Sequence, residues 1–164
     1  MRTEKDLAEK VYLSLREKDK LVFLDAVELI PGKDWEEGFT LGLQNSKVIV
    51  PLISKAGLEG IRNLQAGGKD NVLYEYEMAL EQMESRGLRI IPLHVAEIKA
   101  DGSIVPFGDF NPTLYPDHQS KTCTTRTVRE TMQMMFKLQG IRCIPQLSGI
   151  QEAIKQVIES MEKP

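Results

Sequence analysis

The sequence predicts an α/β fold in which a parallel sheet is covered by helices on both faces. Short, wholly apolar runs alternate along the chain with segments whose apolar residues recur every three or four positions. Such runs are typical of strands buried on both faces, and the longer period is typical of amphipathic helices. We expect one domain over residues 1–164, because no repeat or low-complexity linker divides the chain.

The first half of the chain contains two predicted helices and two predicted strands. In chain order these are a helix marked by Leu7, Val11 and Leu15, a strand at Leu21–Leu24, a helix marked by Trp35, Phe39 and Leu43, and a strand at Val48–Ile53. Pro31-Gly32 predicts a break before the second helix. Residues 57–70 include four glycines, so we expect a loop there with at most one helical turn.

The second half continues the alternation. A helix over Val72–Met83 should end at Arg86-Gly87, and Leu88–Val95 should form the next strand. The proline-containing stretch from Gly102 to Ser120 predicts an irregular connection. The last predicted elements are a helix marked by Val128, Met132, Met135 and Phe136, a strand at Ile141–Ile144, and a helix capped by Ser148 with a stripe of Ile150, Ile154, Val157, Ile158 and Met161.

The order of elements has one irregular feature at its beginning. The alternation starts with a helix, whereas a doubly wound sheet would normally have a strand before Thr3. We therefore expect the sheet to lack its first strand within this chain.

Composition excludes several classes of protein. A formal net charge of −3 provides no basic excess for nucleic acid, and no stretch reaches the roughly 20 apolar residues of a membrane-spanning helix. Cys123 and Cys143 are too few for a disulfide framework and favour a reducing compartment such as the cytosol. His94 and His118 have no ligands at metal-binding spacing, so we expect no metal site. We expect His94 to be a structural residue with satisfied hydrogen bonds and Cys143 to be a small buried hydrophobe.

Four ordered motifs connect the sequence to a known family. They are VFLD at 22–25 followed by ELIPGKDW at 28–35, NSKVIVPLIS at 45–54, DNVLYEYEMAL at 70–80, and RIIPL at 89–93. This succession resembles the Toll/interleukin-1 receptor (TIR) domain family, whose fold is a flavodoxin-like three-layer sandwich with a central parallel sheet. The resemblance covers roughly residues 3–95 and is looser after Val95.

The resemblance implies roles for particular residues. Leu29–Trp35 matches the BB loop, through which TIR domains contact one another, so self-association and other TIR domains as partners are implied. Glu75 matches the glutamate of the members that cleave NAD⁺, which release nicotinamide and need no cofactor or metal. Asp25, Leu29, Gly32 and Ser54 lie at or just beyond strand ends and are weaker candidates for lining an NAD⁺ pocket.

The geometry of the predicted helix separates its glutamates. At about 100° per residue, Glu75 lies about 80° from the centre of the apolar stripe, whereas Glu77 and Glu81 lie about 115° and 155° away. Glu75 would thus stand at the edge of the core, where a carboxylate can line a cleft, while Glu77 and Glu81 would lie farther round the helix. A single carboxylate also suits the chemistry, since nicotinamide leaves as a neutral molecule and the ribosyl cation that remains needs a nearby negative charge.

Two other functions stay open from the sequence. The chain could be a non-catalytic adaptor that acts by binding other TIR domains, or a sensor that binds NAD⁺ without cleaving it. The NAD⁺-cleaving members often have a tryptophan four residues before the glutamate, where this chain has Asn71. The resemblance leads us to expect an NAD⁺ nucleosidase, with cyclisation as a further activity, in cytoplasmic immune or cell-death signalling.

Overall fold

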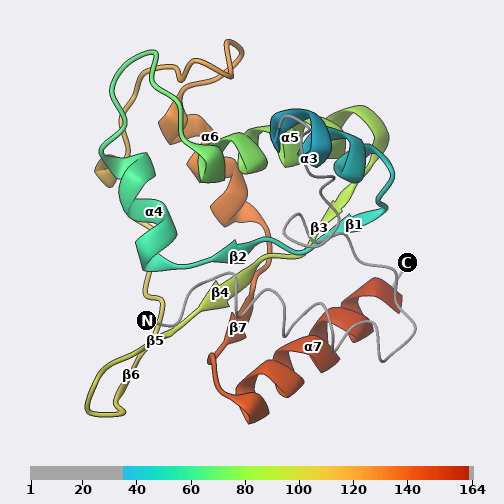
Figure 1. Cartoon of the computed structure of the whole chain (residues 1–164), viewed down its shortest axis with the longest axis vertical. Coiled ribbons are helices and arrows are strands. Elements are labelled where there is room, and N and C mark those ends of the chain that lie inside the picture. Colours follow the sequence, from blue (N-terminus) through green and yellow to red (C-terminus); the bar gives the residue numbers. More distant parts are fainter. Residues whose placement is uncertain (1–34, 163–164) are drawn as a thin grey trace.

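The computed structural model describes residues 35–162 as helices packed on both sides of a parallel sheet (Figure 1). The predicted helix around residues 7–15, the predicted strand at 21–24, the break at Pro31-Gly32 and the expected absence of a first strand lie outside the described residues. The described elements are α3 (Trp35–Gln44), β1 (Val48–Ile49), β2 (Leu52–Ile53), α4 (Lys55–Arg62), α5 (Asn71–Arg86), β3 (Arg89–Ile90), β4 (Leu93–Val95), β5 (Glu97–Ile98), β6 (Ile104–Val105), the 3₁₀ turn η1 (Pro112–Leu114), α6 (Val128–Lys137), β7 (Ile141–Cys143) and α7 (Leu147–Glu162).

The sheet confirms the parallel arrangement predicted from the apolar runs. β2, β4 and β7 lie side by side in chain order and pair in parallel, and β1 pairs with β3 in parallel. Strands adjacent in the sheet and joined by helices are characteristic of a doubly wound α/β fold. The fold is therefore consistent with the flavodoxin-like architecture expected from the sequence.

Two prolines divide the predicted strands. The expected strand at 48–53 is split into β1 and β2 around Pro51, and the expected strand at 88–95 is split into β3 and β4 around Pro92. The pairing continues across both breaks, since Ile91 N–H donates to Ile49 O at 2.9 Å and Leu93 N–H donates to Pro51 O at 2.9 Å. Proline accepts but cannot donate a backbone hydrogen bond, so the ladder is interrupted without any change of register.

Alternation along β4 and β7 directs side chains to two cores. Leu93 and Val95 of β4, with Ile141 and Cys143 of β7, pack against the apolar stripe of α7, which consists of Ile150, Ala153, Ile154 and Val157. The opposite face of the sheet carries the larger core, to which α4, α5 and α6 contribute Leu58, Ile61, Leu73, Tyr76, Leu80, Met132 and Met135. In Figure 1, α7 accordingly lies on one side of the sheet and α4, α5 and α6 lie on the other.

The prediction of a loop at 57–70 is in part wrong, because α4 extends to Arg62. The Ser54 side chain accepts a hydrogen bond from Gly57 N–H at 3.1 Å, and Leu58 and Ile61 are buried. Burial of this apolar face outweighs the low helix propensity of glycine. Gly60 has a packing role, since a Cβ there would lie 2.7 Å from Asp70 Oδ2. The glycine therefore allows α4 to approach the start of α5.

Two other boundaries differ from the prediction. α7 begins at Leu147, so Ser148 is an exposed residue of its first turn and not its cap. The hydrogen bond from Ile150 N–H to Gln146 O at 2.8 Å shows that the helix starts earlier than Ser148. The connection expected to be irregular, from Gly102 to Ser120, contains the turn η1 and the strand β6, which pairs antiparallel with the preceding β5.

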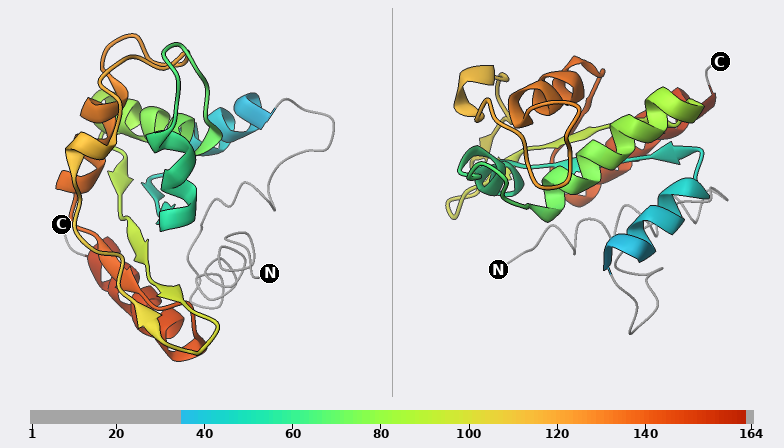
Figure 2. Two further views of the ribbon diagram at one scale, coloured as in Figure 1. Left: turned by 90° about the vertical axis from the view of Figure 1, so that its left-hand side faces the viewer. Right: turned by 90° about the horizontal axis from the view of Figure 1, so that it is seen from above.

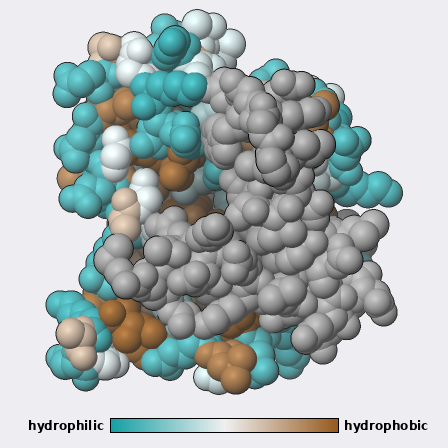
Figure 3. Space-filling view, in the orientation of Figure 1, coloured by the Kyte–Doolittle hydropathy of each residue, from teal (hydrophilic) through white to brown (hydrophobic). Residues whose placement is uncertain are grey.

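The surface view shows where apolar side chains remain exposed. Hydrophobic atoms appear along the lower edge in Figure 3, at the end of the molecule where the β5–β6 hairpin and the start of α7 lie in Figure 1. Ile104 of β6 is 43% exposed, Leu147 at the start of α7 is 73% exposed, and Ile144, between β7 and α7, is 37% exposed. No helix within residues 35–162 is both long enough and apolar enough to span a membrane.

Candidate functional site

The helix α5, which carries Glu75, has well-defined ends. Asp70 caps its start by accepting a hydrogen bond from Leu73 N–H at 2.9 Å, and Gly87 ends it in the left-handed conformation with φ 75°. Gly87 N–H donates to Met83 O at 3.1 Å, and the next amide, that of Leu88, donates to Gln82 O at 3.3 Å. These bonds satisfy carbonyls that the helix leaves unpaired. The predicted end at Arg86-Gly87 is thus confirmed.

Glu75 is half-buried on the second turn of α5. The preceding Tyr74 faces α3, where its ring lies 6.2 Å from that of Phe39 and its hydroxyl lies 3.2 Å from Thr40 Oγ1. The following Tyr76 is buried in the core on the sheet side. Because successive helical residues are about 100° apart, Glu75 leaves the helix between α3 and the core. This position agrees with the predicted place at the edge of the apolar stripe.

Glu77 is buried, although helical periodicity places it farther from the apolar stripe than Glu75. Its side chain is 5% exposed and accepts hydrogen bonds from Ser120 Oγ at 2.6 Å and from Thr122 Oγ1. A segment distant in sequence covers this flank of α5, so the apolar stripe alone does not define the buried surface. The donors are 43 and 45 residues away along the chain, and no local pattern indicates them.

The two glutamates leave α5 in nearly opposite directions. Residues two positions apart on a helix are roughly 200° apart around its axis. Both carboxylate oxygens of Glu77 accept hydrogen bonds from hydroxyl groups, and these bonds tie α5 to the segment 119–122. Glu77 therefore has the environment of a structural carboxylate, whereas Glu75 lies on the flank directed toward α3.

A pair of loops supports the Glu77 flank. Gly67 N–H donates to Gln119 O at 3.0 Å, and Lys121 N–H donates to Gly68 O at 2.8 Å. Both views in Figure 2 show these two loops side by side beyond the start of α5. Farther along the helix, Arg126 forms an ion pair with Glu84. The connection between η1 and α6 thus contacts α5 at two points, Glu77 and Glu84.

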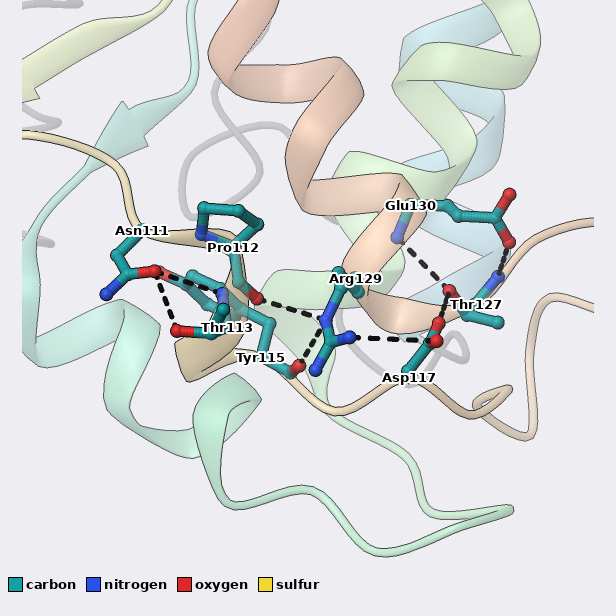
Figure 4. Close-up of polar contacts among 8 residues, drawn as sticks. All are labelled: Asn111, Pro112, Thr113, Tyr115, Asp117, Thr127, Arg129 and Glu130. Carbon is teal, nitrogen blue, oxygen red and sulfur yellow. Dashed lines mark hydrogen bonds and ion pairs between the residues drawn. The ribbon is translucent and has the colours of Figure 1, made fainter.

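Arg129 of α6 fixes the other end of this connection (Figure 4). Its Nε donates to the carbonyl oxygens of Pro112 and Tyr115 at 3.1 and 3.0 Å, and Nη1 lies 3.6 Å from Asp117 Oδ2. Asp117 also accepts a hydrogen bond from Thr127, the residue that caps α6 in a reciprocal pair with Glu130. The turn η1 and the start of α6 are therefore held together by side chains.

The weaker pocket candidates are only partly described. Ser54 lies at the carboxyl end of β2 and caps α4, so its hydroxyl oxygen accepts a backbone hydrogen bond. Its position beyond a parallel strand agrees with the usual location of ligand sites in open α/β sheets. Asp25, Leu29 and Gly32 lie outside the described residues, as does the greater part of the Leu29–Trp35 loop. Asn71, in the place of the family's tryptophan, is exposed on the first turn of α5.

His94 differs from the satisfied structural residue expected from the sequence. Its Nε2 is buried and has no hydrogen-bond partner within residues 35–162. Burial, and next the charge of Arg142, lower the pKa of His94 below its usual value. The sequence signal was a polar residue inside an apolar strand, but the absence of a partner for Nε2 depends on the tertiary structure.

Cys143 in β7 is the small buried hydrophobe expected from the sequence. Cys143 is fully buried, as expected, and burial raises its pKa to about 11. No group of three or more histidine, cysteine or acidic side chains in the described part of the chain could hold a metal ion.

Comparison with known proteins supplies the family. A family model described as TIR domain matches residues 1–126, which includes the predicted BB loop, Ser54 and Glu75 and extends well beyond Val95. No curated protein matches the chain. With a parallel sheet, helices on both of its faces and a match over more than half of its length, the chain belongs to the TIR domain family.

Proposed function

We propose that this TIR domain is an NAD⁺ nucleosidase in which Glu75 is the catalytic residue and NAD⁺ is a substrate. The observation that carries the proposal is the half-buried position of Glu75 on the second turn of α5, between α3 and the core. A carboxylate in such a place is partly shielded from water, which strengthens its interaction with a nearby cation. Ser54, Asp25, Leu29 and Gly32 would contribute to the pocket.

The reaction requires little from the protein besides a placed negative charge. The bond between C1′ of the ribose and the nicotinamide nitrogen breaks, and its electron pair remains on the nitrogen, so nicotinamide leaves as a neutral molecule. Glu75 would stabilise the ribosyl cation and accept a hydrogen bond from a ribose hydroxyl. Water then adds to C1′ and releases a proton, which gives ADP-ribose; capture by a nitrogen of the adenine would give a cyclic product instead.

Activity would depend on association with further copies or other TIR domains. TIR domains generally interact with other TIR domains. For this chain we propose self-association through the Leu29–Trp35 loop, and a cytoplasmic role in immune or cell-death signalling.

The test is nicotinamide release by the concentrated protein, compared with that of single variants of α5. We expect Glu75→Ala and Glu75→Gln to lower kcat by at least about a hundredfold, the order lost when an electrostatic contact to the transition state is removed. Glu81→Ala is the matched control, because Glu81 is exposed on the same helix. Release that continues unchanged in Glu75→Ala would refute the assignment of Glu75.

An adaptor without catalysis is the second candidate. Asn71 is exposed and provides no aromatic ring at the position where the NAD⁺-cleaving members often have tryptophan. An adaptor would release no nicotinamide even when assembled at high concentration, and Glu75→Ala would bind its TIR partners as tightly as the parent. Measuring binding and nicotinamide release on the same samples distinguishes the two functions.

A further inference from the structure

An aromatic cluster lies over the larger core at the carboxyl end of β4. It consists of His94, Phe107, Phe110 and Phe136, from β4, the segment 106–111 and α6. The rings of Phe110 and Phe136 stack at 4.4 Å with an interplanar angle of 13°, and the His94 ring stacks on Phe107 at 5.1 Å and 25°. The centres of the His94 and Phe136 rings are 5.6 Å apart. The imidazole thus joins the segment 106–111 to both the sheet and α6.

The backbone around His94 leaves the imidazole little freedom. A Cβ at Gly140 would lie 2.6 Å from His94 Nε2 and 2.6 Å from Cε1, so the turn before β7 passes directly over the ring. Nε2 is buried there without a hydrogen-bond partner among the described residues. A neutral imidazole can leave this nitrogen unprotonated, but an imidazolium carries a proton on both nitrogens and would bury an unsatisfied, charged donor.

The charges around the cluster also oppose a proton on His94. Arg142 is the register partner of His94 on β7, and the Arg62 guanidinium of α4 lies 5.7 Å from the ring centre of Tyr115, which stacks on Phe110. β2 presents the apolar Ile53 opposite His94, and Lys137 follows Phe136 on α6. Asp109 is the carboxylate of the segment 106–111; it is exposed, and no ion pair within residues 35–162 joins it to His94.

We propose that His94 holds the segment 106–111 against the sheet while its imidazole is neutral. Protonation of His94 then releases this segment. Attraction between an imidazolium and the faces of Phe107 and Phe136 would offset only part of the cost of protonation. Three effects disfavour a protonated His94 in this position: the loss of hydration, the unpaired donor at Nε2 and the repulsion by Arg142. The segment 106–111 is short and follows a hairpin, so it can leave without unfolding α6 or β7.

The sign of the pH dependence follows from the direction of the shift. The pKa of His94 in the folded protein is lowered by burial and then by Arg142 from its usual value of 6.5. Between the unfolded and folded pKa values the unfolded chain binds more protons than the folded one, so stability falls with falling pH. The effect is absent above about pH 7.5 and sets in as the pH falls through 6.5, the usual pKa of histidine.

Nuclear magnetic resonance of the full chain with ¹³C-labelled phenylalanine tests this release. The phenylalanine signals and the His94 ring signals are followed as the pH is lowered. Stacked rings shift one another's signals, so we expect the signals of Phe107, Phe110 and Phe136 to collapse toward unstructured values as His94 becomes protonated. The chain has only two histidines, so His118→Phe is the matched control and should retain the acid transition. In His94→Phe the signals should stay dispersed from pH 7.5 to pH 5.

A surface variant keeps the test decisive if His94→Phe folds poorly. Arg142 is exposed, and Arg142→Gln removes the cation beside His94. Protonation of His94 should then destabilise the closed segment less, so the loss of phenylalanine dispersion should move to lower pH than in the parent. The proposal is overturned if the phenylalanine signals of the parent stay dispersed down to pH 5, if they collapse equally in His94→Phe, or if Arg142→Gln leaves the transition unmoved.

Discussion

At the scale of single residues, α5 carries two glutamates two positions apart with different surroundings. Glu77 is buried between α5 and two hydroxyl groups, and Glu75 is half-buried on the flank toward α3. A buried carboxylate is tolerated because hydrogen bonds replace the water it loses. Helical periodicity places Glu77 farther from the apolar stripe than Glu75, but it takes no account of the segment 119–122, which covers Glu77.

The Glu77 network predicts a measurable loss of stability. Glu77→Ala would leave Ser120 Oγ buried without its acceptor, at a cost of about 1–3 kcal/mol in the free energy of unfolding. Urea unfolding followed by circular dichroism measures the change. Glu81→Ala, exposed on the same helix, should change stability by less than about 0.5 kcal/mol. Equal midpoints for the two variants would show that the Glu77 network contributes nothing.

At the scale of elements, helix ends are the features best predicted from the sequence. Gly87 was expected to end α5 and does so with φ 75°, a conformation that glycine adopts without strain. The start of α7 was misplaced, and the helix α4 was expected to be a loop. For α4 tertiary packing decided, since Leu58 and Ile61 are buried against α5 and the sheet.

The C-cap of α5 gives a prediction in which the order of two variants matters. Gly87→Ala forces a side chain into the left-handed region at a cost of about 1–2 kcal/mol. No atom lies within 4 Å of a Cβ placed at Gly87, so the cost comes from the backbone alone. Asparagine tolerates this conformation better than alanine does. The melting temperature of Gly87→Asn should therefore lie between those of the parent and of Gly87→Ala. Thermal unfolding gives the order, and equal melting temperatures for alanine and asparagine would contradict the argument.

At the scale of the whole molecule, we expect the proposed activity to depend on association between domains. Pro31→Ala and Trp35→Ala alter the Leu29–Trp35 loop, and we expect both to weaken self-association in sedimentation experiments. Because these variants assemble less, their nicotinamide release per molecule should be lower than that of the parent. In the parent, release per molecule should rise with protein concentration. Glu75→Ala should assemble as the parent does. Loop variants that remain fully associated would exclude this loop as the contact.

The sequence by itself determined the class of fold, the order of the described strands and helices apart from α4, the β5–β6 hairpin and η1, and the place of Glu75 at the edge of the apolar stripe. These features follow from local periodicity, from β-branched runs such as 48–53 and from end signals such as Gly87, all of which act over a few residues. It also supported membership of the TIR family, because the four motifs occur in order.

Only the tertiary structure decided which polar side chains are buried and what they contact. The hydroxyl donors to Glu77, the aromatic cluster around His94 and the close approach of Gly60 to Asp70 join residues from separate parts of the chain. A polar group is stable in the core only if distant segments supply its partners, and no local pattern encodes that supply. The same reason explains why Nε2 of His94, left without such a partner in residues 35–162, could be recognised only after the chain was folded.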